Sequence, residues 1–204
     1  MPSSWISLAE ELARKDKLLA PLIKRVGPPK IELQTDAFRA LVESILSQQL
    51  AVRAAATITA RFRALHPPFP TAPAILKMRK TKLRGAGLSG QKTSYVKSLS
   101  ERWQDKVWRR GWASLSDEEL IARLIEVKGI GEWTAHMFLI FSLGRPDVLP
   151  TGDFGVRKGI QLLHGLKEMP LPKEIPGLVP HWKGASSIGA WYVWRGLDSD
   201  YWKG

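Results

Sequence analysis

The segment from Val127 to Ala135, VKGIGEWTA, constrains the fold more than any other part of the chain. Gly129 and Gly131 flank one apolar residue, Ile130, and helical patterns lie on both sides. Such a turn joins two helices and presents backbone N–H groups where the second helix begins. These groups and the helix dipole favour a bound phosphate. A Gly-x-Gly pair alone is equally compatible with a plain helix–helix turn.

Apolar residues recur at helical spacing through most of the chain, and strand-like alternation is nearly absent. Ser116 and Glu119 form a capping box, which predicts a helix that leads into the glycine turn. The predicted helices of this region are 117–127, 132–143 and 153–165. A proline-rich segment at 166–180, which we expect to be mostly loop, and a final tryptophan-rich helix with a tail follow. The pattern predicts an all-α fold.

The charge of the chain points to a polyanionic partner. The formal net charge is +12, and a strongly basic protein attracts nucleic acid. Residues 77–98 hold basic side chains and no acid: Lys77, Arg79, Lys80, Lys82, Arg84, Lys92 and Lys97. Clustered lysines contact phosphates without reading sequence. A generally basic surface remains the alternative, but this concentration favours a nucleic-acid-binding patch.

The composition excludes several kinds of site. The chain has no cysteine, which excludes disulfides, thiolate zinc sites, cysteine nucleophiles and cysteine-ligated iron–sulfur clusters. The four histidines are scattered without metal-ligand spacing. We therefore expect no cofactor and no required metal. A secretory leader and a membrane span are not recognisable, so we expect an intracellular protein, in the cytoplasm or nucleoid or in a eukaryotic nucleus.

Asp153, in the segment LPTGDFG, stands just before a helical pattern. Aspartate is a favoured N-cap, and a cap also fixes the position of its carboxylate. The same side chain could therefore act on a reacting sugar. Asp147 is the only other acid between residues 133 and 167, so this region offers no carboxylate pair and no acidic metal cluster.

Aromatic and amide residues supply a third signal. Trp133, Phe154 and Trp194 could stack on a flipped base, although core packing is the simpler interpretation for any one of them. Gln48-Gln49-Leu50 interrupts an apolar helical pattern. Two amides and a leucine at a helix junction suit insertion between bases, or form a solvated turn.

These features together resemble the helix-hairpin-helix–GPD superfamily of DNA glycosylases, and within it the 3-methyladenine DNA glycosylase II group. The matching segments are Ile45–Leu50, Leu83–Ser89, Val127–Ala135, Leu149–Gly155 and Trp182–Trp194. The resemblance implies one domain over residues 1–204 with a DNA-binding cleft between two helical lobes. One lobe would comprise residues 1–35 and 149–204, and the other residues 36–148.

The resemblance also implies roles for individual residues. Asp153 matches the catalytic aspartate, and the base pocket would be lined by Trp133, Met137, Phe154 and Trp194. The implied DNA contacts are Gln48, Gln49, Leu50, Ser89, Lys92, Lys128, Gly129, Ile130, Gly131 and Thr134. Gln49 or Leu50 would be the wedge that fills the vacated stack. Carbonyls near Val127 and Gly129 match a site where relatives often hold a monovalent cation.

One position separates the subclasses of the family. Relatives that also cleave the strand carry a lysine immediately before the Thr-Ala pair, where this chain has Trp133. An indole cannot form a Schiff base. The resemblance therefore implies a monofunctional, monomeric enzyme that hydrolyses the N-glycosidic bond of alkylated purines, such as 3-methyladenine and 7-methylguanine, in double-stranded DNA. A glycosylase for hypoxanthine or uracil, and a non-catalytic DNA-binding protein, are the alternatives.

Overall fold

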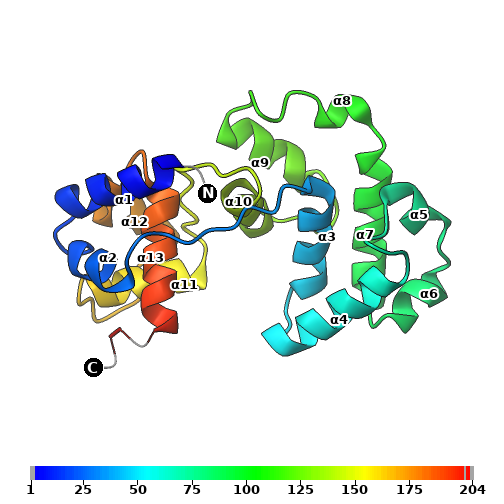
Figure 1. Ribbon diagram of the computed structural model, residues 1–204, viewed down its shortest axis with the longest axis horizontal. Helices are drawn as coiled ribbons and strands as arrows, with labels where there is room; N and C mark the ends of the chain where they lie inside the picture. Colours follow the sequence, from blue (N-terminus) through cyan, green and yellow to red (C-terminus); the bar gives the residue numbers. More distant parts are fainter. Residues whose placement is uncertain (1–2, 200, 203–204) are drawn as a thin grey trace. The chain divides into compact units, whose positions relative to one another are not determined.

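The computed structural model describes residues 3–199 and 201–202 (Figure 1). These residues form helices and no strand, which confirms the all-α prediction. None of the described helices is long and apolar enough to cross a membrane. The chain divides into two compact units: unit 1 comprises residues 1–33 and 139–204, and unit 2 comprises residues 34–138. The lobe limits implied by the resemblance, with residues 36–148 as one lobe of a single domain, stay a prediction.

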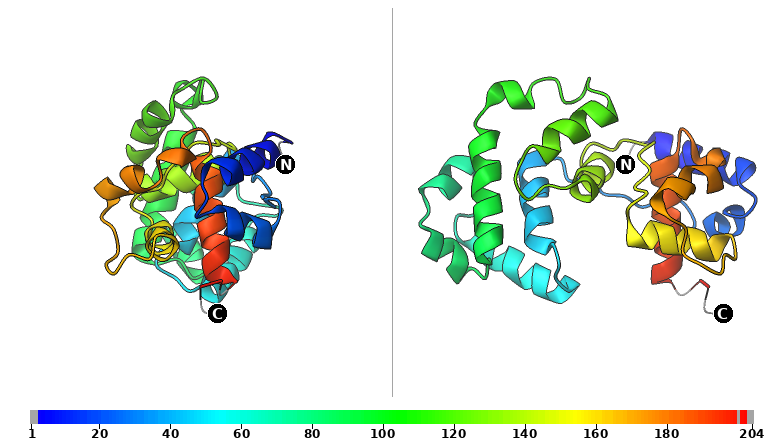
Figure 2. Two further views of the ribbon diagram at one scale, coloured as in Figure 1. Left: turned by 90° about the vertical axis from the view of Figure 1, so that its left-hand side faces the viewer. Right: turned by 180° about the vertical axis from the view of Figure 1, so that it is seen from behind.

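Unit 1 is built around helix α13 (Ser186–Asp198), which packs against three other helices (Figures 1 and 2). These are α1 (Ser3–Lys15), α2 (Ala20–Val26) and α11 (Phe154–Leu163). The predicted loop at 166–180 is partly wrong, because it contains short helical turns: η1 (Pro172–Glu174), α12 (Ile175–Leu178) and the start of η2 (Pro180–Trp182). Each begins with a proline in its first turn, where proline is tolerated because its missing N–H needs no partner.

Two glycines bring α11 and α13 unusually close together. A Cβ atom at Gly159 would lie 2.5 Å from the Cβ of Val193. A Cβ at Gly155 would lie 2.8 Å from the Cδ1 of Trp194. Because these glycines are four residues apart on α11, they share one face of the helix, and this face receives two consecutive side chains of α13. The backbone at the start of α11 is therefore fixed against α13.

Unit 2 contains the other helices, with α7 (Gly90–Trp103) in contact with α3, α5, α6 and α8 (Figure 1). Their bounds are α3 (Ala37–Ser47), α4 (Val52–Ala64), α5 (Ala72–Lys77), α6 (Lys80–Gly85), α8 (Lys106–Arg109), α9 (Asp117–Ile125) and α10 (Glu132–Phe141). The predicted capping box at Ser116 and Glu119 is confirmed at the start of α9. Helix α10 runs to Phe141, so its last residues belong to unit 1.

A cluster of aromatic rings fills part of the core of unit 2. Trp103 lies 5.1 Å from Phe38 and 5.6 Å from Trp112, measured between ring centroids. Trp112 in turn lies 5.0 Å from Trp108 and 5.6 Å from Phe138. The edge-to-face geometry of the three indoles is a favoured arrangement for aromatic pairs. Trp108 and Trp112 are thus buried packing residues, and Trp103 is half-buried against them.

Asp16 is the main buried acid of unit 1, with only 6% of its surface exposed. Its Oδ1 accepts hydrogen bonds from the backbone N–H groups of Leu18 at 2.9 Å and Leu19 at 3.0 Å. Its Oδ2 accepts one from Nε1 of the fully buried Trp182 at 2.7 Å. One carboxylate thus joins the turn between α1 and α2 to the segment before α13.

We predict that Asp16→Ala lowers the free energy of unfolding by about 3 kcal/mol, because it leaves buried donors without an acceptor. The matched control is Asp36→Ala, which removes an exposed N-cap of α3 and costs about 1 kcal/mol. Denaturant unfolding of both variants measures the difference. Equal losses for the two would contradict this role for Asp16.

Candidate functional site

The glycine turn predicted between two helices lies between α9 and α10. The N–H of Ile130 donates to the carbonyl of Val127 at 3.0 Å, and the N–H of Ala135 donates to that of Gly131 at 3.0 Å. Gly129 has a φ of +93°, and a Cβ atom there would lie 2.2 Å from the Cγ of Tyr95. Both the left-handed backbone and the contact with the Tyr95 ring therefore require glycine.

Gln48 attaches the hairpin to the end of α3. Its Nε2 donates to the carbonyl of Gly129 at 2.8 Å and to the Oγ1 of the buried Thr134 at 3.4 Å. Gln48 and Gly129 are 81 positions apart in the sequence. Gln48 therefore has a structural role in the hairpin. The sequence shows only that Gln48 interrupts a helical pattern, so it does not predict this role.

Lys92 and Ser89 lie at the start of α7. The Oγ of Ser89 accepts from the backbone N–H of Lys92 at 3.1 Å, which makes Ser89 the N-cap of this helix. The Nζ of Lys92 donates to the carbonyl of Leu46 at 2.6 Å, near the C-terminal end of α3. Partial burial lowers the pKa of the Lys92 ammonium below its ordinary value.

A polar cavity of about 370 Å³ brings most of the predicted DNA-contacting residues together. Its lining comprises Gln48, Gln49, Ser89, Gln91, Lys92, Tyr95, Gly129, Ile130 and Gly131. Gln91 and Tyr95 were not anticipated; they are four residues apart on α7, and the Gln91 amide donates to the Tyr95 hydroxyl. Three predicted contacts, Leu50, Lys128 and Thr134, are absent from this lining.

Both candidates for the wedge are exposed. Leu50 has 39% of its surface exposed, although it is a large apolar residue. Gln49 is exposed as well, and its φ of 55° is in the left-handed region, which is uncommon for a residue with a Cβ. The junction between α3 and α4 thus presents two side chains outward, and the choice between them stays a prediction.

The carbonyls predicted to face a monovalent cation have hydrogen-bond donors of their own. Val127 accepts from Ile130, and Gly129 accepts from Gln48. A carbonyl oxygen has two lone pairs, so one acceptor position on each can still face a cation. Within the described part of the chain, no group of three or more histidine or acidic side chains could hold a metal ion.

Asp153 is the N-cap of α11, as its position in the sequence predicts. Its Oδ1 accepts from the backbone N–H of Val156 at 2.8 Å. The same oxygen accepts from the indole Nε1 of Trp194 at 2.8 Å. The ring of Trp194 also lies 5.8 Å from that of Phe141. The contact between Trp194 and the carboxylate was not anticipated, because the two residues are distant in the sequence.

The four residues predicted to line a base pocket are divided between the units. Trp133 and Met137 are on α10 in unit 2, whereas Phe154 and Trp194 are in unit 1. Trp133 and Phe154 have 45% and 68% of their surfaces exposed, so neither is a buried core residue. Met137 and Trp194 are half-buried. Exposed aromatic faces suit stacking, and the pocket itself stays a prediction.

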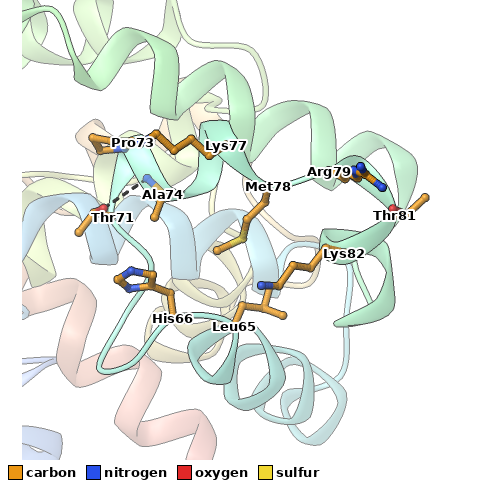
Figure 3. Close-up of a pocket in the computed structure, with 10 residues that line it drawn as sticks. All are labelled: Leu65, His66, Thr71, Pro73, Ala74, Lys77, Met78, Arg79, Thr81 and Lys82. Atoms are coloured by element: carbon orange, nitrogen blue, oxygen red, sulfur yellow. Dashed lines mark hydrogen bonds between the residues drawn. The ribbon is translucent and has the colours of Figure 1, made fainter.

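The basic side chains of segment 77–98 have different surroundings, and Lys80 and Arg84 are simply exposed. Lys77, Arg79 and Lys82 line a groove of about 880 Å³, beside His66 and the apolar Met78 (Figure 3). Lys92 and Lys97 instead donate to backbone carbonyls at the ends of α3 and α5. The predicted patch is therefore partly a cationic groove and partly a set of helix caps.

We predict that Gly129→Ala lowers the free energy of unfolding by about 2 kcal/mol or more, through left-handed strain and the clash with Tyr95. Gly131→Ala is the matched control, because a Cβ there meets nothing within 4 Å and φ is not positive. It is expected to stay within about 0.5 kcal/mol of the parent. Denaturant titration compares the two, and a stable Gly129→Ala variant would contradict the geometry.

Comparison with known proteins places the chain in a family. The family model described as "HhH-GPD superfamily base excision DNA repair protein" matches residues 42–182. DNA-3-methyladenine glycosylase 1 of Schizosaccharomyces pombe is 33% identical over 183 residues, covering 88% of this chain and 80% of the relative.

Two solved structures are similar over nearly the whole chain. The 3-methyladenine DNA glycosylase of S. pombe in complex with abasic DNA gives a TM-score of 0.83 at 32% identity, covering 94% of this chain and 97% of that one. A DNA-3-methyladenine glycosidase of Bacillus halodurans gives 0.84 at 28% identity, covering 95% and 90%. By its hairpin, its all-α fold and these matches, the chain belongs to the HhH-GPD superfamily of base excision DNA repair proteins.

Proposed function

We propose that this chain is a DNA glycosylase that releases alkylated purines, such as 3-methyladenine and 7-methylguanine, by hydrolysis of the N-glycosidic bond. The observation that carries the proposal is the Asp153 carboxylate, fixed at the start of α11 by Val156 and Trp194. Support comes from relatives named DNA-3-methyladenine glycosylase and from a similar chain bound to abasic DNA, the product of base release.

A single carboxylate is sufficient for this chemistry. A purine alkylated at a ring nitrogen carries positive charge, so it is already a good leaving group and needs little acid catalysis. As the bond to C1′ breaks, the sugar develops oxocarbenium character. The Asp153 carboxylate stabilises this charge and orients or deprotonates the attacking water. The products are the free base and an abasic site in an intact strand.

The residues of unit 2 bind the DNA. The hairpin and the start of α10 bind a backbone phosphate, as helix N-termini do. The cavity lined by Gln48, Ser89 and Lys92 adds polar donors at the same place. Gln49 or Leu50, which are both exposed, enters the stack when the damaged nucleotide leaves it. Trp133, Met137, Phe154 and Trp194 contact the extruded base. An enzyme with this substrate acts inside the cell.

We predict that Asp153→Asn reduces the single-turnover rate of base release by a factor of about a hundred or more, since it removes the charge that faces the sugar. Folding and DNA affinity persist, because asparagine is also a good N-cap. Chromatography of the bases released from alkylated, hypoxanthine-containing and uracil-containing duplexes measures activity and separates the candidate substrates.

The matched control is Asp147→Asn. Asp147 accepts a hydrogen bond from Ser186 and is the nearest acid in sequence, so its variant should keep the parental rate. Near-parental activity of Asp153→Asn would overturn the mechanism. Release of hypoxanthine or uracil without release of alkylated purines would overturn the substrate class.

We also predict that the enzyme leaves the strand uncut. Trp133 occupies the place of the lysine that forms a Schiff base in strand-cleaving relatives, and an indole has no nucleophilic amine. Borohydride reduction during the reaction should therefore trap no covalent protein–DNA adduct. A trapped adduct that forms with a rate matching base release would contradict the monofunctional assignment.

The cationic groove gives a prediction about salt. Lys77, Arg79 and Lys82 have no ion-pair partner among the described residues and line one face of unit 2. If they bind DNA, replacing all three by glutamine reduces the slope of log affinity against log salt by about 0.9 for each phosphate that they neutralise. A variant with Arg14, Lys17 and Lys24 changed to glutamine, which alters net charge equally, is the control. Equal salt slopes in the two variants would show that the groove does not contact DNA.

A further inference from the structure

We propose that Trp194 is a positioning residue: its indole N–H holds the reactive carboxylate of Asp153 in one orientation. This inference rests on the proposed function and deepens it. The resemblance assigns Trp194 only to the wall of the base pocket. The geometry adds a direct connection between that wall and the group that stabilises the sugar.

Two donors meet on the same oxygen of Asp153. The first is the backbone N–H of Val156, three residues along the chain, at 2.8 Å. The second is Nε1 of Trp194 on α13, also at 2.8 Å and 41 residues away in sequence. A capping bond alone holds the oxygen at the helix terminus. A second donor from another helix also fixes the rotation of the carboxylate plane, because both N–H directions must be satisfied together.

The indole lies against Gly155 of α11 and beside the ring of Phe141. Gly155 leaves room for its edge, since a Cβ there would lie 2.8 Å from Cδ1 and 2.9 Å from Nε1. Gly159 lets Val193, the preceding residue, approach α11 closely. The ring of Phe141 lies 5.8 Å away with an interplanar angle of 33°. The Asp-Phe-Gly sequence at 153–155 therefore contains both the carboxylate and the opening through which its partner reaches it.

This arrangement limits what Trp194 can do to a base. An indole has one N–H group and no acceptor. Because Asp153 takes that N–H, Trp194 can meet a base through its ring face but has no donor to offer to its edge. The hydrogen bond from Trp194 to Asp153 therefore acts on catalysis. A carboxylate that is already oriented stabilises the transition state without having to reorganise.

Two abasic-site analogues in duplex DNA test the inference without relying on turnover. A pyrrolidine analogue carries positive charge at the sugar and mimics the oxocarbenium ion, whereas a tetrahydrofuran analogue is neutral. The ratio of their affinities measures how well the carboxylate faces the sugar. We expect Trp194→Phe, which keeps a ring and removes the N–H, to reduce this ratio about tenfold while tetrahydrofuran affinity stays unchanged.

Two further variants separate positioning from packing. In an Asp153→Asn background, Trp194→Phe should cause no further reduction of the ratio, because it acts through the carboxylate. Replacing Trp194 by benzothienylalanine keeps the shape of the indole but has sulfur in place of the N–H, so it should reproduce the loss even if Trp194→Phe proves unstable. Trp191→Phe, on the same helix, is the control that should retain the parental ratio.

The outcomes are distinguishable. A parental ratio in both the phenylalanine and the benzothienylalanine variants would overturn the positioning role and leave Trp194 as a stacking surface. A further loss of the ratio in the Asp153→Asn background would also overturn it, because the effect would not pass through the carboxylate. If the parent enzyme neither prefers the pyrrolidine analogue nor releases a base, the proposed function fails instead.

Discussion

The close packing of α11 against α13 determines where the Asp153 carboxylate lies. Gly155 and Gly159 remove side-chain bulk from one face of α11, so that Val193 and Trp194 contact it directly. The N-terminal end of α11 then carries a carboxylate that is bonded both to its own helix and to the neighbouring one. A Cβ atom at either glycine would lie 2.5–2.8 Å from a side-chain atom of α13, so α11 and α13 could not keep this spacing.

The hairpin of unit 2 also depends on a glycine that allows a close contact. Gly129 is pressed against the Tyr95 ring, and its carbonyl accepts the Gln48 amide. In both units a glycine permits a close approach, and a long-range hydrogen bond then fixes the result. The hairpin and the Asp153 cap are thus positioned by contacts between segments far apart in the chain, although each is a local element.

The local features were predictable from the sequence, and the long-range ones were not. The caps at Ser116 and Asp153 are encoded within three residues of the helix they begin, so their helices could be anticipated. The partners Trp194 and Tyr95 carry no such signal, because their roles depend on how helices cross. The tryptophan count alone could not separate the buried Trp108 from the exposed Trp133.

Lys92 has a consequence for how this surface meets a polyanion. The carbonyl of Leu46 lies near the C-terminal end of α3, and a helix C-terminus carries about half a negative charge. Such a negative helix end disfavours a nearby anion. By donating to the carbonyl of Leu46, the ammonium of Lys92 places a positive charge at this helix end, which offsets its partial negative charge. One lysine side chain thus caps the C-terminal end of α3 and also lines the cavity beside the hairpin.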